Sequence, residues 1–413
     1  MALDSFIRSL DIMFKPDFPL IINHQEIIYL DNAATTQKPA MVIDGVSEFV
    51  KNEYANIHRW HYDLSEKSED HYEHSKELVG ELFNCSYKEV IYTANATASF
   101  NLIAQTLVNS KKLNKWDTVL LGIWDHHANI LSWMSLSKHF WFKVKFFWLT
   151  ENYEIDYDDF KKKYTDDVKV VSCWWVSNVT WGICDVKKIK TLLRDDTFYV
   201  IDASQAAPNI LIDFQDVGCD ALIFTGHKMM AYTGIGWLLL KRDLLKQLEP
   251  LTVGGGTIKD VSVDDFELRK WRLKYEAGTP NIIWAVSLEY ALEYIKSLWK
   301  WDMKKWMQVI EKHEQELAEY WVEKFKEVSD KVKLIWPEKN RIPLFSFIIK
   351  GHENFNQVGE YFAEKWICIR CWGHCAYPLH KSLNVGWSAR VSTYLYNTQE
   401  DIEKFFEVLK TML

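Results

Sequence analysis

The sequence predicts an α/β protein with a largely parallel sheet, followed by a smaller α+β domain. Between residues 27 and 241, short apolar runs alternate with longer amphipathic stretches, which is the pattern of buried strands separated by helices. Polar residues collect directly after these runs, where open parallel sheets bind their ligands. The predicted strands are 90–93, 118–121, 168–172, 198–201, 221–224 and 237–240.

The remaining elements follow in order along the chain. The first 20 residues have the pattern of a short helical arm that ends at Pro16 and Pro19, and the three glycines at 254–256 mark a turn or flexible loop. Residues 282–330 carry apolar side chains at helical spacing, and the composition changes near Leu298. Beyond that point we expect strands 345–349 and 367–370, a helix near 355–365, and a final helix 399–412 capped by Asn397 or Thr398.

Charge and composition exclude several classes of protein. The 413 residues carry a net charge of −8, so no broad basic surface for nucleic acid is expected. No uncharged apolar run reaches the roughly 18 residues of a membrane-spanning helix, and the first residues do not resemble a signal peptide. Seven cysteines, an odd number in a long chain, indicate reduced thiols in a cytoplasmic protein rather than a disulfide scaffold.

A lysine and an aspartate follow two of the predicted strands. Lys228 comes just after strand 221–224, and Asp202 directly follows strand 198–201. Taken alone, Lys228 could be a solvated surface lysine and Asp202 a helix cap. Together, at neighbouring strand ends, they are the amine and carboxylate that pyridoxal phosphate (PLP) needs, one for a Schiff base and one for the pyridine nitrogen.

Two adjacent histidines, His126 and His127, follow strand 118–121. They could form a metal pair, lie in the core, or offer an aromatic surface. No third ligand stands at helical spacing, so a zinc site is the weaker interpretation. Stacking of one imidazole on a flat cofactor fits the position better.

Ten motifs in sequence order resemble the SufS-type cysteine desulfurases, within the class-V, fold-type I aminotransferase superfamily. The resemblance implies a large PLP-binding domain over residues 26–297 with a mainly parallel seven-stranded sheet. It also implies an N-terminal arm over 1–25 that packs with the small domain, and a small domain over 298–413 that carries the catalytic loop. The motifs are 29–34, 58–59, 93–101, 125–129, 176–178, 201–205, 225–228, 276–281, 370–375 and 389–390.

The resemblance assigns a role to each candidate site residue. Lys228 would bind PLP covalently and move the substrate Cα proton, Asp202 would pair with the pyridine nitrogen, and His126 would stack on the ring and act in proton transfer. Arg390 would hold the substrate carboxylate bidentately. Gln205 and Asn178 would face the ring and the substrate; Ala96, Thr97, Thr225 and His227 would bind the phosphate, with Thr279 from the other subunit of a homodimer; Ala33, His58 and Arg370 would contact the substrate.

Cys375 is the nucleophile that the resemblance implies. A thiolate beside cationic groups attacks sulfur, and Arg370 and His374 could supply the charge. The expected reaction converts L-cysteine to L-alanine and leaves a persulfide on Cys375. A SufE- or SufU-type acceptor would then take the sulfur to iron–sulfur cluster assembly.

Three alternatives remain open for this site. The first is a selenocysteine lyase that acts on L-selenocysteine, and the second is a non-catalytic PLP-fold scaffold for sulfur transfer. The third reads the cluster of Cys368, Cys371, His374 and Cys375 as metal or iron–sulfur ligands. We expect no metal, because Cys368 lies within a predicted strand and the family uses one cysteine here.

The balance of tryptophan and glycine is abnormal, with 20 Trp and only 16 Gly. Several tryptophans stand at turns where the family has glycine, and the largest side chain is the worst replacement for the smallest. We hypothesise that the source bacterium reads UGA as glycine, whereas this sequence reads it as tryptophan. Trp133 and Trp271 match family tryptophans. The suspect positions are Trp60, Trp116, Trp181, Trp284, Trp336, Trp366 and Trp372.

Overall fold

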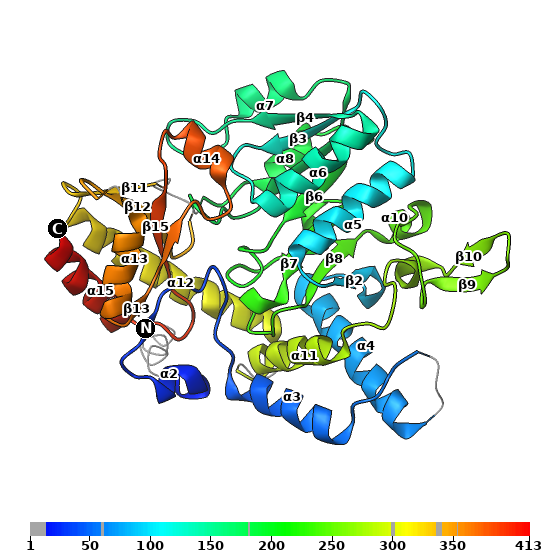
Figure 1. The fold of residues 1–413 in the computed structure, drawn as a ribbon, viewed down its shortest axis with the longest axis horizontal. Coiled ribbons are helices and arrows are strands. Elements are labelled where there is room, and N and C mark those ends of the chain that lie inside the picture. The colour runs from blue at the N-terminus through cyan, green and yellow to red at the C-terminus, as the bar shows by residue number, and fades with distance from the viewer. Residues whose placement is uncertain (1–13, 59–61, 181, 299–301, 336–340, 353) are drawn as a thin grey trace.

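A seven-stranded sheet forms the centre of the larger part of the molecule (Figure 1). The computed structural model describes residues 14–58, 62–180, 182–298, 302–335, 341–352 and 354–413. The strand order is β2-β8-β7-β6-β5-β3-β4, and β8 alone runs opposite to the other six strands. This confirms the predicted α/β class and the mainly parallel sheet. The strands are β2 (Val90–Thr93), β3 (Thr118–Gly122), β4 (Lys143–Phe147), β5 (Val168–Trp174), β6 (Phe198–Asp202), β7 (Ala221–Thr225) and β8 (Gly236–Leu240).

Strand β4 was not predicted from the sequence. It lies at the sheet edge, where it pairs with β3 alone. Its sequence, Lys-Val-Lys-Phe-Phe, lacks the continuous apolar run of the central strands, and its first residue is exposed. Charged residues are common on edge strands because they oppose pairing with other chains.

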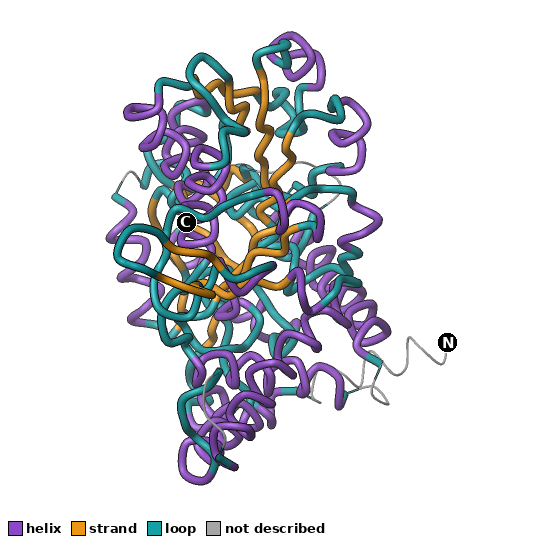
Figure 2. The backbone as a smooth tube through the Cα atoms, turned by 90° about the vertical axis from the view of Figure 1, so that its right-hand side faces the viewer, coloured by secondary structure: helices purple, strands orange, loops and turns teal. Residues whose placement is uncertain are grey.

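Helices cover both faces of this sheet, as Figure 2 shows from the side. Because successive strand residues point to opposite faces, Leu121 packs in one hydrophobic cluster and Leu120 in the other. The helices of this part are α3 (Ala40–Asn52), α4 (Asp63–Phe83), α5 (Ala96–Asn109), α6 (His127–Phe140), α7 (Tyr157–Lys163), α8 (Val186–Leu192), α9 (Phe214–Val217), α10 (Arg242–Gln247) and α11 (Ile282–Ser297). The hairpin of β9 (Ile258–Val261) and β10 (Phe266–Leu268) projects outward from the rest of the molecule (Figure 1).

A second, antiparallel sheet in the order β11-β12-β15-β14 organises the C-terminal part. Trp321, Phe325, Phe405 and Phe406 form an aromatic core between its helices and the sheet. The domain limits at 25 and 297 stay predictions. The elements are β11 (Val332–Leu334), β12 (Leu344–Ile349), β14 (Arg370–Trp372), β15 (Ser388–Ser392), α12 (Met303–Lys326), α13 (Phe355–Glu364), α14 (Tyr377–Ser382) and α15 (Gln399–Met412).

The N-terminal segment contacts the C-terminal part. After α2 (Pro19–Asn23), strand β1 (Ile28–Tyr29) pairs in parallel with β13 (Ile367–Cys368). Lys15 forms an ion pair with Asp401 of α15, at 2.9 Å. Residues 1–13 of the predicted arm lie outside the described residues. Among the described residues, no helix combines the length and the apolar character needed to cross a membrane.

Left-handed backbone occurs at two of the suspect tryptophans. Trp116 has φ of 77° and Trp366 has φ of 61°, a region that favours glycine. Trp284 lies within helix α11 and Trp372 on strand β14, so the backbone there does not call for glycine. Trp60, Trp181 and Trp336 lie outside the described residues. Trp141 and Trp271 also have positive φ, although Trp271 was predicted to be a genuine tryptophan.

Glycine at position 366 or 116 is expected to stabilise the protein. Relief of left-handed strain contributes about 1–2 kcal/mol, and the added freedom of the unfolded chain removes about 0.5–1 kcal/mol. Both indoles are more than half exposed, so little packing is lost. Urea unfolding of W366G and W116G should therefore show a gain of about 0.5–1 kcal/mol each. W372G on strand β14 is the control and should show no gain; a loss in all three variants would contradict the strain argument.

Candidate functional site

A hollow of about 180 Å³ lies at the carboxyl ends of β5, β6 and β7, beside the loop that follows β14. A larger hollow of about 820 Å³, at the base of the β9–β10 hairpin, contains none of the predicted site residues. The smaller one brings together all of them except Thr279 and His58. Its predicted lining residues are Ala33, Ala96, Thr97, His126, Asn178, Asp202, Gln205, Thr225, His227, Lys228, Arg370, Cys375 and Arg390.

Lys228 and Asp202 form the centre of this pocket. Lys228 ends a 3₁₀ turn, Gly226–Lys228, that directly follows β7. Burial lowers the pKa of the Lys228 ammonium to about 8; Arg390 adds to the shift and Asp202 opposes it. Asp202, at the end of β6, accepts a hydrogen bond from Ser204 N at 2.9 Å, and burial raises its pKa. A reactive amine and a buried carboxylate therefore face the same small space.

Helix α5 begins at the pocket. Asn95 caps the helix by accepting a hydrogen bond from Ala98 N at 2.9 Å, so the free amides of the first turn, at Ala96 and Thr97, border the pocket. His227 lies close by; burial, with Lys228 next, lowers its pKa to about 3, so its ring is neutral. A helix start suits a phosphate dianion. Amine, carboxylate and helix start together fit PLP.

His126 presents a neutral ring to the pocket. Burial, followed by the Lys228 charge, lowers its pKa to about 3. Its Nδ1 accepts a hydrogen bond from Ala128 N at 3.0 Å, so the remaining proton lies on Nε2. The flat face suits the predicted stacking, and Nε2 can donate a hydrogen bond. Its role in proton transfer stays a prediction.

Cys375 lies in a strained loop at the pocket. His374 and Cys375 both have left-handed backbone, with φ of 47° and 55°. Two hydrogen bonds hold this loop: His127 N donates to Cys375 O at 2.8 Å, and Asn178 Nδ2 donates to His374 O at 2.6 Å. The Cys375 side chain is half-buried.

The structure corrects the expectation that His374 supplies positive charge to the thiol. His374 is buried, and burial, with Arg390 next, lowers its pKa well below the usual range. Its Nε2 donates to Ser388 O at 3.0 Å. A neutral His374 leaves Arg370 as the predicted cation of the loop. In the described part of the chain, no group of three histidine, cysteine or acidic side chains could hold a metal ion.

Arg390 is anchored at the base of the pocket on β15. Its Nη1 donates to Asn178 O at 3.1 Å, and its Nη2 lies 3.2 Å from Asp31 Oδ1. No acceptor among the described residues reaches Nε. The guanidinium is thus fixed in orientation and keeps a donor for a ligand. Gln205 is fixed in a similar way, since its Nε2 donates to Ala33 O at 2.9 Å.

Sequence reasoning missed several residues around the pocket. Asp31 lies in motif 29–34 and could have been found there as the partner of Arg390. Ser204 lines the pocket and lies in motif 201–205 but was given no role, and Trp174 lines the pocket without following a recognisable pattern. Asp125 is buried beneath it, where it accepts hydrogen bonds from Asn129 Nδ2 and from Trp174 N.

Similarity to known proteins shows the family of this chain. Residues 28–405 match the family described as aminotransferase class-V. The chain is 34% identical over 399 residues to a probable cysteine desulfurase of Staphylococcus epidermidis, covering 95% of this chain and 94% of the relative. It is 33% identical over 415 residues to a probable cysteine desulfurase of Synechocystis, covering 98% and 96%.

Solved structures resemble the fold closely. An apo cysteine desulfurase from Thermococcus onnurineus superposes with a TM-score of 0.89 at 29% identity, covering 96% of each chain. The cysteine desulfurase CsdA of Escherichia coli, with an S-sulfonic acid, superposes with a TM-score of 0.86 at 26% identity, covering 97% of each chain. The chain therefore belongs to the class-V aminotransferase family, as one of its cysteine desulfurases.

Proposed function

We propose that the protein is a SufS-type cysteine desulfurase that converts L-cysteine to L-alanine with PLP as cofactor. One observation supports this above the others: Lys228, Asp202, Arg390 and Cys375 all line one pocket of about 180 Å³. In the overall step, the substrate C–S bond breaks and an S–S bond forms on Cys375. Cysteine and the Cys375 thiol thus become alanine and a persulfide, with no external oxidant.

PLP, when bound, supplies an electron sink that stabilises negative charge at the substrate Cα. Asp202 would keep the pyridine nitrogen protonated, and the first turn of α5 would hold the phosphate. Lys228 would hold the cofactor and move the Cα proton, which its lowered pKa favours. His126 would lie against the ring.

Arg390 and Cys375 act on the substrate. Arg390 binds its carboxylate, and the Asn178 carbonyl and Asp31 keep the guanidinium oriented for this. The hydrogen bonds from His127 and Asn178 hold the Cys375 loop so that the thiol faces the pocket. Orientation of this kind lowers the entropic cost of sulfur attack.

We further propose two protein partners. Cys375 is only half-buried, so a SufE- or SufU-type acceptor can reach its persulfide and take the sulfur to iron–sulfur cluster assembly. Thr279 is exposed and lies outside the pocket of its own chain, which supports a homodimer with shared sites.

The lowered pKa of Lys228 predicts a pH dependence for cofactor uptake by the apo-protein. Only the neutral amine attacks the PLP aldehyde, and this form predominates above a pKa of about 8. The rate of covalent uptake, followed by absorbance, should rise up to about pH 8 and then level off. An ordinary lysine, with its pKa of 10.5, would give a rate that still rises at pH 10.

The proposed function is tested with the PLP-loaded protein and L-cysteine. Alanine and protein-bound sulfane sulfur should appear in equal amounts during the first turnover. Alanine without bound sulfur would contradict the persulfide step, and the absence of alanine would overturn the function.

A further inference from the structure

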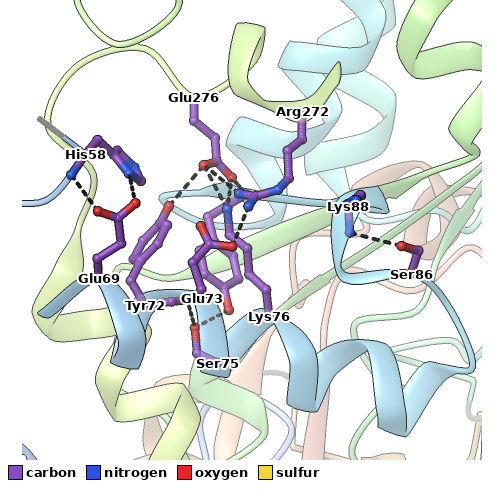
Figure 3. Close-up of polar contacts among 11 residues, drawn as sticks. His58, Glu69, Tyr72, Glu73, Ser75, Lys76, Ser86, Lys88, Arg272 and Glu276 are labelled. Carbon is purple, nitrogen blue, oxygen red and sulfur yellow. Dashed lines mark hydrogen bonds and ion pairs between the residues drawn. The ribbon is translucent and has the colours of Figure 1, made fainter. Parts of the chain in front are cut away.

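One buried polar network connects the two predicted site residues that lie outside the pocket. It consists of Glu276 with Lys76, Tyr72, Arg272 and Glu73, and we call it the Glu276 network (Figure 3). Glu276 opens motif 276–281, which carries Thr279. Tyr72 lies against His58. The network therefore reaches both residues from the interior of the large domain.

Glu276 is the centre of this network. Lys76 Nζ donates to both of its oxygens, at 2.7 and 2.8 Å, and Tyr72 Oη donates to Oε2 at 3.1 Å. Tyr92 N of β2 donates to Oε1 at 2.7 Å, and Arg272 Nη1 lies 4.0 Å from Oε2. The carboxylate thus ties its loop to α4, to β2 and to the 3₁₀ turn Trp271–Lys274.

Charge in this network is well matched. The Lys76 side chain is fully buried and that of Glu276 is 8% exposed. Burial alone would raise the pKa of Glu276, but the charges of Lys76 and Arg272 outweigh it and hold the pKa below its usual range. Buried ion pairs add little stability compared with apolar packing, so their value lies in a defined geometry.

The Thr279 end of the network is an exposed loop with fixed ends. Beyond Glu276, Gly278 N donates to Gly255 O at 2.6 Å, and Asn281 Nδ2 donates to Gly234 O at 3.0 Å. Between these anchors the Thr279 side chain is exposed and does not line its own pocket. The loop is therefore shaped to present Thr279 outward.

The His58 end is held by a second carboxylate. Glu69 accepts hydrogen bonds from His58 N at 3.1 Å and from His58 Nδ1 at 3.0 Å (Figure 3). The His58 ring packs edge-on against Tyr72, with ring centroids 5.8 Å apart. His58 has φ of 81°, so these contacts hold it in a strained backbone conformation.

We propose that Glu276 is a positioning residue that holds Thr279 and His58 in the arrangement in which they enter the active-site pocket of a second copy of the chain. Thr279 contributes to the phosphate end of that pocket and His58 to its substrate side. The inference rests on the proposed PLP enzyme and homodimer.

Mixed dimers test whether Glu276 acts on the site of the partner subunit. One subunit is wild type, and the other carries K228A, so that only the first can bind PLP covalently. E276Q on the K228A subunit should raise the PLP dissociation constant of the other subunit's site by about tenfold, the value of one charge-assisted hydrogen bond. E276Q on the wild-type subunit should leave that constant within about twofold. A purely structural role would raise the PLP dissociation constant equally whichever subunit carries E276Q, or more at the site of the subunit that carries it. Either result would overturn the proposal.

Two control variants separate this result from other failures. Glu289 is a buried glutamate of α11 that pairs with His71 and lies outside the network. E289Q should therefore leave the PLP dissociation constant unchanged, whichever subunit carries it. T279A on the K228A subunit tests the shared site itself. If T279A weakens PLP binding and E276Q does not, the positioning role fails and the shared site stands. If T279A has no effect, the shared phosphate site is wrong.

A milder variant tests the His58 end should E276Q fail to fold. Glu69 is 40% exposed, so E69Q removes its charge with little effect on folding. On the K228A subunit, E69Q should raise the KM for L-cysteine severalfold and leave the PLP dissociation constant unchanged. Equal changes in the KM and the PLP dissociation constant, or no change in KM, would overturn the proposed division of roles, with His58 at the substrate side and Thr279 at the phosphate end.

Discussion

Replacement of Cys375 by serine is expected to lower alanine release from L-cysteine by at least about a thousandfold. The serine hydroxyl is nearly the same size but is neither ionised at neutral pH nor reactive toward sulfur. The loop should keep its shape, because the hydrogen bonds that hold it use the backbone oxygens of His374 and Cys375. PLP absorbance should therefore be unchanged while alanine, measured by chromatography, is lost.

Cys371 offers a matched control four residues earlier. Burial raises the pKa of its thiol to about 12, so it stays protonated. Its side chain lies toward α13, 3.7 Å from where a Cβ at Gly359 would stand. C371S should keep near-normal activity. Full activity in C375S, or an equal loss in C371S, would assign the nucleophile elsewhere.

Replacement of Arg390 by lysine is expected to raise the KM for L-cysteine by about a hundredfold, with a smaller effect on kcat. The planar guanidinium can satisfy Asn178 O, Asp31 and a substrate carboxylate together, whereas an ammonium group offers a single point charge. Loss of two charge-assisted hydrogen bonds at a buried site costs about 3 kcal/mol, which corresponds to the expected rise in KM of about a hundredfold. Steady-state kinetics of R390K would measure it.

Arg194 provides the corresponding control for a change from arginine to lysine. It also donates to a backbone carbonyl, Val168 O at 2.7 Å, but it does not line the pocket. R194K should leave the KM unchanged. A similar KM for R390K and the wild type would show that another cation binds the carboxylate.

The central features of fold and site could be predicted because they depend on local patterns. Six of the seven strands of the main sheet are apolar runs; Asp202 ends one of them, and Lys228 lies in the 3₁₀ turn that follows another. Parallel strands bring such ends to one edge, so the pair is close in space although 26 positions apart in the sequence. The edge strand β4 was missed because its two lysines interrupt the apolar pattern.

The remaining features depend on tertiary structure. The neutral state of His374 follows from its burial and from the charge of Arg390, which no local pattern reveals. The contact of Asp31 with Arg390 joins residues 359 positions apart. The place of Thr279 and His58 outside their own pocket becomes evident only when the loop anchors and Glu69 are located.

The left-handed tryptophans affect how a sample of this protein should be prepared. If the source organism reads UGA as glycine at 116 and 366, an ordinary laboratory expression host, which reads UGA as a stop signal, truncates the chain made from the same gene. A gene recoded with tryptophan codons at these positions would give a product with two large indoles, each more than half exposed, on its surface. Exposed aromatic groups favour self-association. A gene resynthesised with glycine codons at these positions should therefore yield the more soluble protein.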